Sequence, residues 1–386
     1  MDGRTREYLS GRFGDYYRSA TLSLPPETER REWGHIPFTG GEGTTMIRHQ
    51  SLLDLGDVAD FLARTGPRHA YFSAAAYDDP GAGTMSEKGW GGADLVFDLD
   101  ADHLPGVDED GAAYAEMLAA CKEALGNLLD LLRDDFGFER LRIVFSGGRG
   151  YHVHVRDPGV RELDSQARRE IVDYVRAIDV DADDLVTTVS VEGTTRRQLR
   201  TDGGWGARVH DRLVSYVDAL RETEESTAHD RLQELDGVGE GRAETVLGAV
   251  SRNPDAVRAG NVEVGGPGLR KLLDALATET FRAETAPIDE PVTTDLRRLI
   301  RLPGSLHGGS GLVVEPIDPD DVADFEPLVD AVPERFRGRR IMIDVTEPGP
   351  VPVGADSFTI GEGLKSVPEF AGVFLMARGR AEKAPE

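Results

Sequence analysis

The sequence has 386 residues, of which 39% are hydrophobic, and its 70 acidic and 44 basic side chains give a net charge of −26. A chain of this length folds around a sizeable core, and its single cysteine, Cys121, excludes an internal disulfide and a zinc site built from several cysteines. No apolar run is long enough to span a membrane and the first residues lack a signal-peptide core, so we expect a soluble cytoplasmic protein with no membrane contact.

Lysine is rare in this chain, because five lysines leave 39 arginines among the basic residues. An acidic, lysine-poor surface suits a cell with molar internal salt, where the Debye length falls to about 3 Å and surface charges no longer repel one another. We therefore favour a halophilic protein, with an ordinary acidic enzyme as the alternative. Any contact with a nucleic acid would have to come from local clusters of arginine.

The first hundred residues predict helices and one clear strand. Apolar side chains recur at helical spacing over residues 9–20, and a shorter helical pattern lies within 48–64, after a glycine-rich stretch. Residues 93–100 form an apolar run with an acidic end, which predicts a strand.

The middle of the chain continues this alternation. The apolar stripe over residues 112–135 predicts the strongest helix of the chain, and Cys121 lies in that stripe, where we expect it to pack in the core. Residues 141–145 and 151–155 predict two strands joined by the tight turn 146–150. This order of strand, helix, strand, turn and strand is typical of a mixed α/β sheet.

The remaining sequence predicts a helical segment followed by more strands. No strand pattern interrupts residues 208–284, whereas strand patterns return at 311–317 and 340–345. Residues 378–386 are expected to form a frayed tail. We therefore predict an α/β (α+β) fold, a mixed-sheet body interrupted by a mainly helical subdomain, with boundaries at 1–207, 208–284 and 285–386.

Asp98 and Asp100 form the first candidate site. Residues two apart in a strand point to the same side, so both carboxylates can reach one or two divalent cations. Hard oxygen ligands of this kind suit Mg²⁺ or Mn²⁺ bound to phosphates. The spacing recurs elsewhere in this acidic chain, but only this pair interrupts an apolar strand, where charge costs stability unless it is compensated. A solvated strand end is the alternative.

The segment Ser-Gly-Gly-Arg-Gly-Tyr-His over residues 146–152 is the second candidate. Its glycines allow the backbone amides to face an anion. Ser146, Arg149 and His152 add hydrogen-bond donors that suit a triphosphate, and a plain glycine-rich hairpin is the alternative. His154 shares a strand face with His152 and is expected at the surface or as a support behind that histidine.

The third candidate follows residue 288. Apolar residues over 296–302 predict a helical turn that Pro303 ends. Arg301 and His307 then flank the Pro-Gly turn before a glycine-rich loop. The neighbouring arginines at 297 and 298 fit the solvated face of a helix equally well.

The motifs LVFDLD, SGGRGYH and RLIRLPGSLHG, in this order and at these separations, resemble the small, catalytic subunit of archaeal and eukaryotic DNA primase. The resemblance extends over nearly the whole chain and is greatest for haloarchaeal members. It implies that three aspartates bind the catalytic Mg²⁺ or Mn²⁺ ions: Asp98, Asp100 and Asp289. It also implies that five residues bind the nucleoside triphosphate: Ser146, Arg149, His152, Arg301 and His307. Asp289 is preferred to Asp295 by its spacing before the loop histidine and because Asp295 would lie within the predicted helix.

Two departures from the family pattern matter. Members usually carry a Cys/His zinc site soon after the Asp-x-Asp strand, but residues 103–121 hold only His103 and Cys121 as such ligands, so we expect no structural zinc. Many archaeal relatives also have a lysine where this chain has Gly309. A neighbouring arginine or the salt environment must then replace one phosphate contact.

The resemblance implies a nucleotidyltransferase that makes short primers de novo on a single-stranded DNA template by two-metal phosphoryl transfer, as a heterodimer with a primase large subunit. The alternatives are a related end-joining or plasmid-type primase-polymerase, a non-catalytic DNA-binding subunit, and a glycosyltransferase that holds a nucleotide sugar through Asp-x-Asp. The segment 232–246 also resembles half of a helix-hairpin-helix, whose amides would bind a DNA phosphate, although we favour an ordinary turn between packed helices there.

Overall fold

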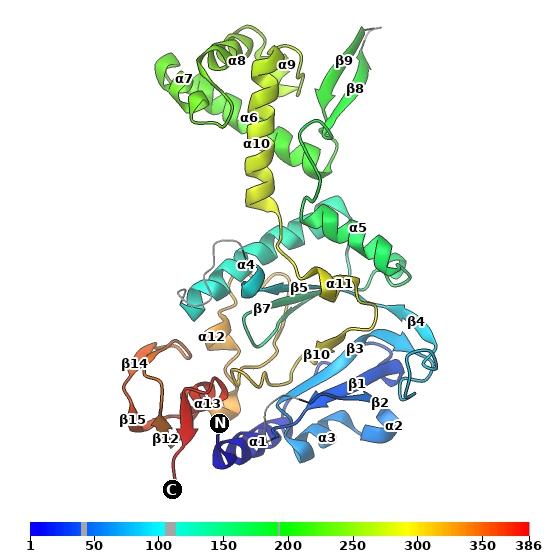
Figure 1. Ribbon diagram of the computed structural model, residues 1–386, viewed down its shortest axis with the longest axis vertical. Coiled ribbons are helices and arrows are strands. Elements are labelled where there is room, and N and C mark those ends of the chain that lie inside the picture. Colours follow the sequence, from blue (N-terminus) through cyan, green and yellow to red (C-terminus); the bar gives the residue numbers. More distant parts are fainter. Residues whose placement is uncertain (40–44, 105–112, 192–193, 386) are drawn as a thin grey trace. The chain divides into compact units, whose positions relative to one another are not determined.

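A computed structural model describes residues 1–39, 45–104, 113–191 and 194–385 of the protein (Figure 1). The chain divides into two compact units: the first contains Met1–Leu125, Glu139–Val172 and Pro287–Glu386, and the second contains Gly126–Phe138 and Asp173–Ala286. The helical segment predicted over 208–284 lies within the second unit. Among the described residues, no helix has the length and apolar character that crossing a membrane requires.

Three antiparallel sheets and a two-stranded ribbon form the framework of the first unit. The first sheet has the order β10-β3-β1-β2, with β4 also paired to β3, and contains β1 (Arg31–Ile36), β2 (Ile47–Gln50), β3 (His69–Tyr77), β4 (Trp90–Ala93) and β10 (Leu299–Arg301). The second has the order β11-β6-β7-β5 and contains β5 (Leu95–Asp100), β6 (Leu141–Phe145), β7 (Gly150–Val155) and β11 (Pro316–Ile317). The third sheet and the ribbon contain β12 (Arg340–Val345), β15 (Gly363–Pro368), β16 (Ala381–Lys383), β13 (Gly349–Val351) and β14 (Phe358–Ile360).

The helices that lie wholly or partly in the first unit are α1 (Gly3–Tyr17), α2 (Leu52–Leu55), α3 (Val58–Thr65), α4 (Tyr114–Asp130), α5 (Ser165–Val175), α11 (Glu290–Thr294), α12 (Pro327–Asp330) and α13 (Glu369–Ala377). The short 3₁₀ helices there are η1 (Thr28–Arg30), η2 (Ala101–His103), η4 (Pro158–Val160) and η5 (Glu334–Phe336). In Figure 1, α1, α2 and α3 lie on the side of β3 away from β7.

The second unit is mainly helical. It contains the hairpin β8 (Val186–Val191) and β9 (Thr194–Leu199), the π-helical turn η3 (Leu131–Asp135), and the helices α6 (Gly204–Glu222), α7 (Glu225–Gln233), α8 (Glu240–Arg252), α9 (Pro254–Arg258) and α10 (Gly266–Glu284). The β8–β9 hairpin is a feature that the sequence analysis did not anticipate.

Helices and sheets together confirm the α+β class, and the central strands are those that the sequence predicted. β7 lies between β5 and β6, all six of its residues are buried, and Asp98 and His152 face each other in the β5–β7 register. Every pair between described strands is antiparallel, so the expected mixed sheet is corrected in this respect. The predicted helix over 112–135 is α4 with its π-helical continuation, and Cys121 is fully buried.

Residues 296–302 correct one sequence prediction, because they do not form a helical turn. Residues 299–301 form strand β10 instead, in which Leu299 and Ile300 pair with Ser73 and Phe72 of β3. Both apolar side chains are buried, and this short pattern fits a sheet edge as well as it fits a helix.

The C-terminal segment differs from expectation, and of the two positions expected for His154 the structure excludes the surface. Residues 381–383 form β16 on β12, and Ala381 and Lys383 are at most 5% exposed, so the segment is not a frayed tail. His154 is completely buried because β7 is a central strand, and its ring stacks on Phe72 with 6.1 Å between centroids. Of the predicted strand 311–317, only Pro316–Ile317 pairs as β11.

Candidate active site

Asp98 and Asp100 interrupt the buried strand β5, whose Phe97 and Leu99 are fully enclosed. The Asp98 side chain is 22% exposed, and its Oδ1 lies 3.4 Å from Nε2 of His152. Of the described residues, no lysine or arginine forms an ion pair with Asp98. Its neighbour Asp100 lies 3.7 Å from Nε of Arg149.

The electrostatic surroundings of Asp98 disfavour its negative charge. Burial raises the pKa of the Asp98 carboxyl to about 7, Arg301 opposes the rise, and the carboxylates of Asp100 and Asp289 add to it. Burial and the same arginine lower the pKa of His152 to about 3, so that histidine is neutral at pH 7 and does not compensate Asp98. Among the described residues, the site therefore holds a carboxylate with no arginine or lysine at ion-pair distance, and the charges of Arg301 and Arg298 offset its burial only in part.

Asp289 lies beside Asp98 because the chain passes β5 just before α11. Its backbone N–H donates to the carbonyl oxygen of Asp98 over 2.9 Å, and Asp289 is the N-cap residue of α11. Asp295 is the exposed C-cap residue of the same helix and not, as expected, a residue within a helix. It lines the same hollow as Asp98.

The Ser146–Gly150 turn joins β6 to β7 next to these carboxylates. The Ser146 N–H donates to the carbonyl oxygen of Gly150 over 2.9 Å, and the Gly148 N–H lies 3.3 Å from the Ser146 hydroxyl oxygen. Gly147 has a φ of +74°, and a Cβ atom there would lie 2.6 Å from Cβ of His307. The turn therefore needs glycine for its conformation and for the close approach of the loop that carries His307.

The loop after β10 holds His307 against this turn. The His307 ring is flanked by Ser310, whose Oγ lies 3.1 Å from Nδ1, and by His69, whose ring centroid is 4.9 Å away. Ser310 also donates to the carbonyl oxygen of Gly147. Burial and Arg301 lower the pKa of His307 well below its usual range, so it contributes a neutral imidazole.

Two hollows meet at Arg301. The first, of about 260 Å³, is lined by Asp100, Tyr114, Ser146, Gly148, Arg149, Arg301, His307, Gly309, Ser310 and Arg378. The second, of about 340 Å³, is lined by Met46, Arg48, Tyr71, Asp98, His152, Val292, Asp295, Arg297, Arg298, Leu299, Ile300 and Arg301. Of the predicted site residues only Asp289 lines neither hollow.

The sequence analysis missed several of these lining residues. Tyr114 was included only in the apolar stripe of a helix, and Arg378 lay in the predicted tail. Arg297 and Arg298 lie not on a helix face but beside the hollow that contains Asp98. No local motif marks Arg48 or Arg378, because both reach the site only through tertiary packing.

The arrangement fits divalent cations that share their coordination with phosphate. Within the described ranges, no three His, Cys, Asp or Glu side chains converge tightly enough to hold a metal by themselves. Mg²⁺ is commonly bound by one or two carboxylates together with substrate phosphates and water, so a closed protein cage is not required. The uncompensated Asp98, with Asp100 beside it, provides such a carboxylate pair.

The comparisons with known proteins identify the family of this chain. The family model described as DNA primase small subunit matches residues 97–319, a range that contains all eight predicted site residues. The chain belongs to the DNA primase small subunit family. The DNA primase small subunit PriS of Halorubrum lacusprofundi is 67% identical to it, that of Haloarcula marismortui is 58% identical, and that of Methanococcoides burtonii is 38% identical; each match covers the full length of both chains. Arg48 and Arg378 lie outside the matched range of the family model.

Proposed function

We propose that this protein is the catalytic subunit of a DNA primase, a nucleotidyltransferase that starts short primers de novo on single-stranded DNA for replication. The observation that carries the proposal is the placement of two carboxylates in hollows that share Arg301. Asp98, with no arginine or lysine at ion-pair distance among the described residues, lines the larger hollow, and Asp100 lines the smaller one. Membership of the primase family supports this activity over an end-joining or plasmid-type polymerase, a DNA-binding subunit or a glycosyltransferase.

Asp98, Asp100 and Asp289 would hold Mg²⁺ or Mn²⁺. When bound, such ions lower the pKa of a primer 3′-hydroxyl and neutralise charge on the triphosphate. The protein's part is to fix the carboxylates: the β5–β7 register positions Asp98 and Asp100, and the amide of Asp289 is bonded to the backbone of Asp98. His152 is neutral and does not cancel the charge of Asp98, and because it lines the hollow of Asp98 its predicted contact with the triphosphate stays a prediction.

The nucleoside triphosphate would bind in the 260 Å³ hollow between the Ser146–Gly150 turn and the His307 loop. Arg149 and Arg301 would contribute guanidinium groups, and Ser146 and His307 would contribute uncharged hydrogen-bond donors. Held by these groups, the triphosphate would present its α-phosphorus to the primer hydroxyl, so catalysis would come from alignment and electrostatic stabilisation. No covalent enzyme intermediate is needed.

The proposal includes partners and location. The names of the relatives call them small subunits, so we propose a heterodimer with a primase large subunit, working in the cytoplasm on a single-stranded DNA template. The α7–α8 turn exposes Gly237 and Gly239; an ordinary turn between packed helices stays the favoured interpretation, with a DNA contact as the alternative.

We also expect no structural zinc. Much of the segment 103–121 on which this expectation depends, namely residues 105–112, lies outside the described residues. Elemental analysis of the purified protein should find well below one zinc per chain, and a stoichiometric amount would contradict the expectation.

The test is primer synthesis on unprimed single-stranded DNA in molar KCl with Mn²⁺ or Mg²⁺, with and without a large subunit. Asp98→Ala/Asp100→Ala should make no product. The matched control is Asp318→Ala/Asp320→Ala, which removes an exposed pair with the same spacing and should synthesise like the wild type. Wild-type extension only from a supplied primer would favour the end-joining polymerase, and no product under any condition would overturn the proposal.

A further inference from the structure

Arg378 reaches the nucleotide hollow from the opposite end of the sequence. It is the C-cap residue of α13 (Glu369–Ala377), a helix in which every residue except Phe370 is buried, so packing fixes the position of its backbone. Its side chain is exposed and lines the same hollow as Arg149 and Arg301.

Tyr114 connects Arg378 to the Ser146–Gly150 turn. The Tyr114 hydroxyl donates to the carbonyl oxygen of Gly148, and the Arg378 guanidinium carbon lies 4.5 Å from the centroid of the Tyr114 ring. A second ring, that of Phe374, lies 5.4 Å from the same carbon. Stacking on two aromatic rings orients the planar guanidinium without using its N–H donors, which remain available for an anion.

The arginines of this hollow differ in how far the protein neutralises them. Arg149 forms ion pairs with Asp102 and Asp100. Arg301 faces the carboxylate of Asp98, whose pKa it lowers. Arg378, like Arg301, forms no ion pair with a carboxylate among the described residues, so its charge is available to an anion in the hollow.

We propose that Arg378 is a phosphate-binding residue of the nucleotide site and contacts the triphosphate next to Tyr114 and the Ser146–Gly150 turn. This inference rests on the proposed function for the identity of the ligand. It also assigns a source for the positive charge that Gly309, a lining residue of the same hollow, does not provide.

The experiment measures binding of inorganic tripolyphosphate by titration calorimetry, so it does not depend on catalysis. The proteins are wild type, Arg378→Ala, Arg378→Lys and the control Arg339→Ala, which removes an equally exposed arginine outside both hollows. Thermal unfolding of each variant comes first. Because Arg378 is exposed, we expect unchanged folding; Arg378→Lys provides a second, less disruptive variant.

Loss of one charge-assisted contact should weaken tripolyphosphate binding about tenfold or more in Arg378→Ala, with partial recovery in Arg378→Lys. The KM for nucleotide should rise by the same factor, while kcat and template affinity stay near wild type. Equal tripolyphosphate affinity in Arg378→Ala and Arg339→Ala would overturn the inference. A raised nucleotide KM with unchanged tripolyphosphate affinity would also overturn it, because Arg378 would then contact the base or sugar. Absence of primer synthesis by the wild type would instead count against the proposed function, and the calorimetry would still decide the role of Arg378.

Discussion

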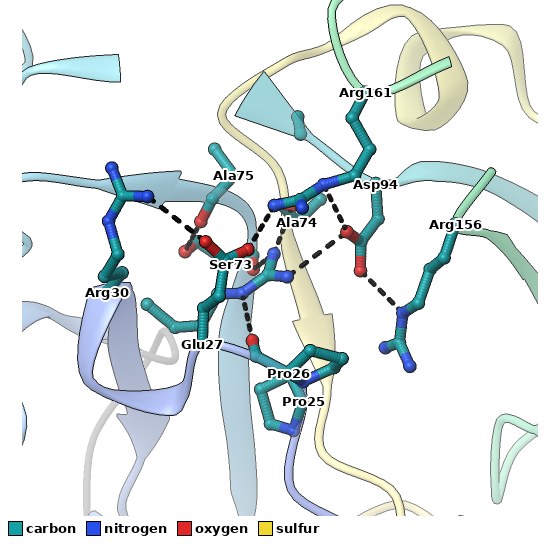
Figure 2. A network of polar contacts seen from close by, with 12 residues as sticks. Pro25, Pro26, Glu27, Arg30, Ser73, Ala74, Ala75, Asp94, Arg156 and Arg161 are labelled. Atoms are coloured by element: carbon teal, nitrogen blue, oxygen red, sulfur yellow. Dashed lines mark hydrogen bonds and ion pairs between the residues drawn. The ribbon is translucent and has the colours of Figure 1, made fainter. Parts of the chain in front are cut away.

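Asp94 directly precedes β5 and Asp98 lies within it, four residues further on, but the two carboxylates have opposite electrostatic surroundings. Asp94 is 1% exposed and is surrounded by arginines: its carboxylate accepts from Arg31 over 3.2 Å and from Arg156 over 2.9 Å, and Nε of Arg161 lies 3.7 Å away (Figure 2). Asp98 has only the neutral His152 within ion-pair distance among the described residues.

The contrast separates a structural carboxylate from a functional one. Figure 2 shows Arg161 and Arg156 directed at the Asp94 carboxylate, and Glu27 at the other side of Arg161 extends the network to Arg30. A buried charge of this kind is compensated permanently and holds strands together. No arginine or lysine among the described residues lies at ion-pair distance from Asp98, so the position is suited to a cation that arrives with the substrate.

We expect the largest change in the free energy of unfolding when the paired carboxylate of Asp94 is removed. Asp94→Ala leaves the buried Arg31 guanidinium without its carboxylate, and removal of one partner of a buried pair costs about 3–5 kcal/mol. Denaturant unfolding should therefore show a large loss of stability relative to the exposed control Asp318→Ala. A loss below about 1 kcal/mol would mean that the network in Figure 2 carries little of the fold.

Asp98→Ala should give the opposite pattern, with the fold retained and activity lost. Even a residue that only supports a metal ligand typically contributes 10–100-fold, so loss of a ligand itself should reduce primer synthesis by more than about 100-fold. The measurement is the initial rate of synthesis at fixed Mn²⁺, with circular dichroism to verify folding. Activity near the wild-type rate would contradict the assignment of Asp98 as a ligand.

The pH dependence of the free energy of unfolding should distinguish Asp98 from a carboxylate that is held in ion pairs, such as Asp94. The folded-state pKa of Asp98, about 7, lies above the ordinary value of 3.8. The unfolded chain therefore binds fewer protons between these values, and the ionised carboxylate destabilises the fold most above pH 7. In EDTA at pH 8, Asp98→Asn should raise the free energy of unfolding by up to about 4 kcal/mol, and this gain should shrink as the pH falls from about 7 to about 4.

Chemical denaturation of wild type and Asp98→Asn at pH 8 and pH 5 measures this gain. Addition of Mn²⁺ at pH 8 should stabilise the wild type and reduce the difference. A variant that is less stable than the wild type at both pH values would show that Asp98 is compensated after all.

The smallest effect is expected at Arg149. Its side chain is partly exposed, unlike that of Arg31, and it forms ion pairs, whereas Arg378 forms none among the described residues. The Arg149 guanidinium is 34% exposed and already paired with Asp102, so an incoming phosphate exchanges one ion pair for another. Arg149→Ala should raise the nucleotide KM by about threefold to tenfold and weaken template binding less. Equal losses in both quantities would contradict a role at the triphosphate.

The sequence predicted the parts of the site that depend on local pattern. The apolar strand that contains Asp98 and Asp100, the glycine turn at 146–150 and the buried Cys121 are present as expected. Each of these signals is contained within a few neighbouring residues, so no distant contact was needed to interpret it.

The predictions from sequence were wrong where contacts between distant residues determine the structure. Leu299 and Ile300 became strand because the edge of β3 accepts them, and the C-terminal segment is ordered because β12 pairs with it. That ordering places Arg378 over Tyr114, although 264 residues of sequence separate the two. The arginines that surround Asp94 likewise come from two other segments, Arg31 from β1 and Arg156 and Arg161 from the residues after β7, so neither compensation nor its absence is visible in the sequence around β5.

The most direct test of the account is Mn²⁺ binding in the absence of nucleotide, measured from the paramagnetic resonance signal of the free ion. Wild type and Asp318→Asn/Asp320→Asn should bind with equal affinity, whereas Asp98→Asn/Asp100→Asn should bind at least about tenfold more weakly. The reason is that Asp98 is a buried carboxylate with no arginine or lysine at ion-pair distance among the described residues, whereas Asp318 and Asp320 are exposed to water. Equal affinity in all three proteins would show that the carboxylates of β5 are not the metal site.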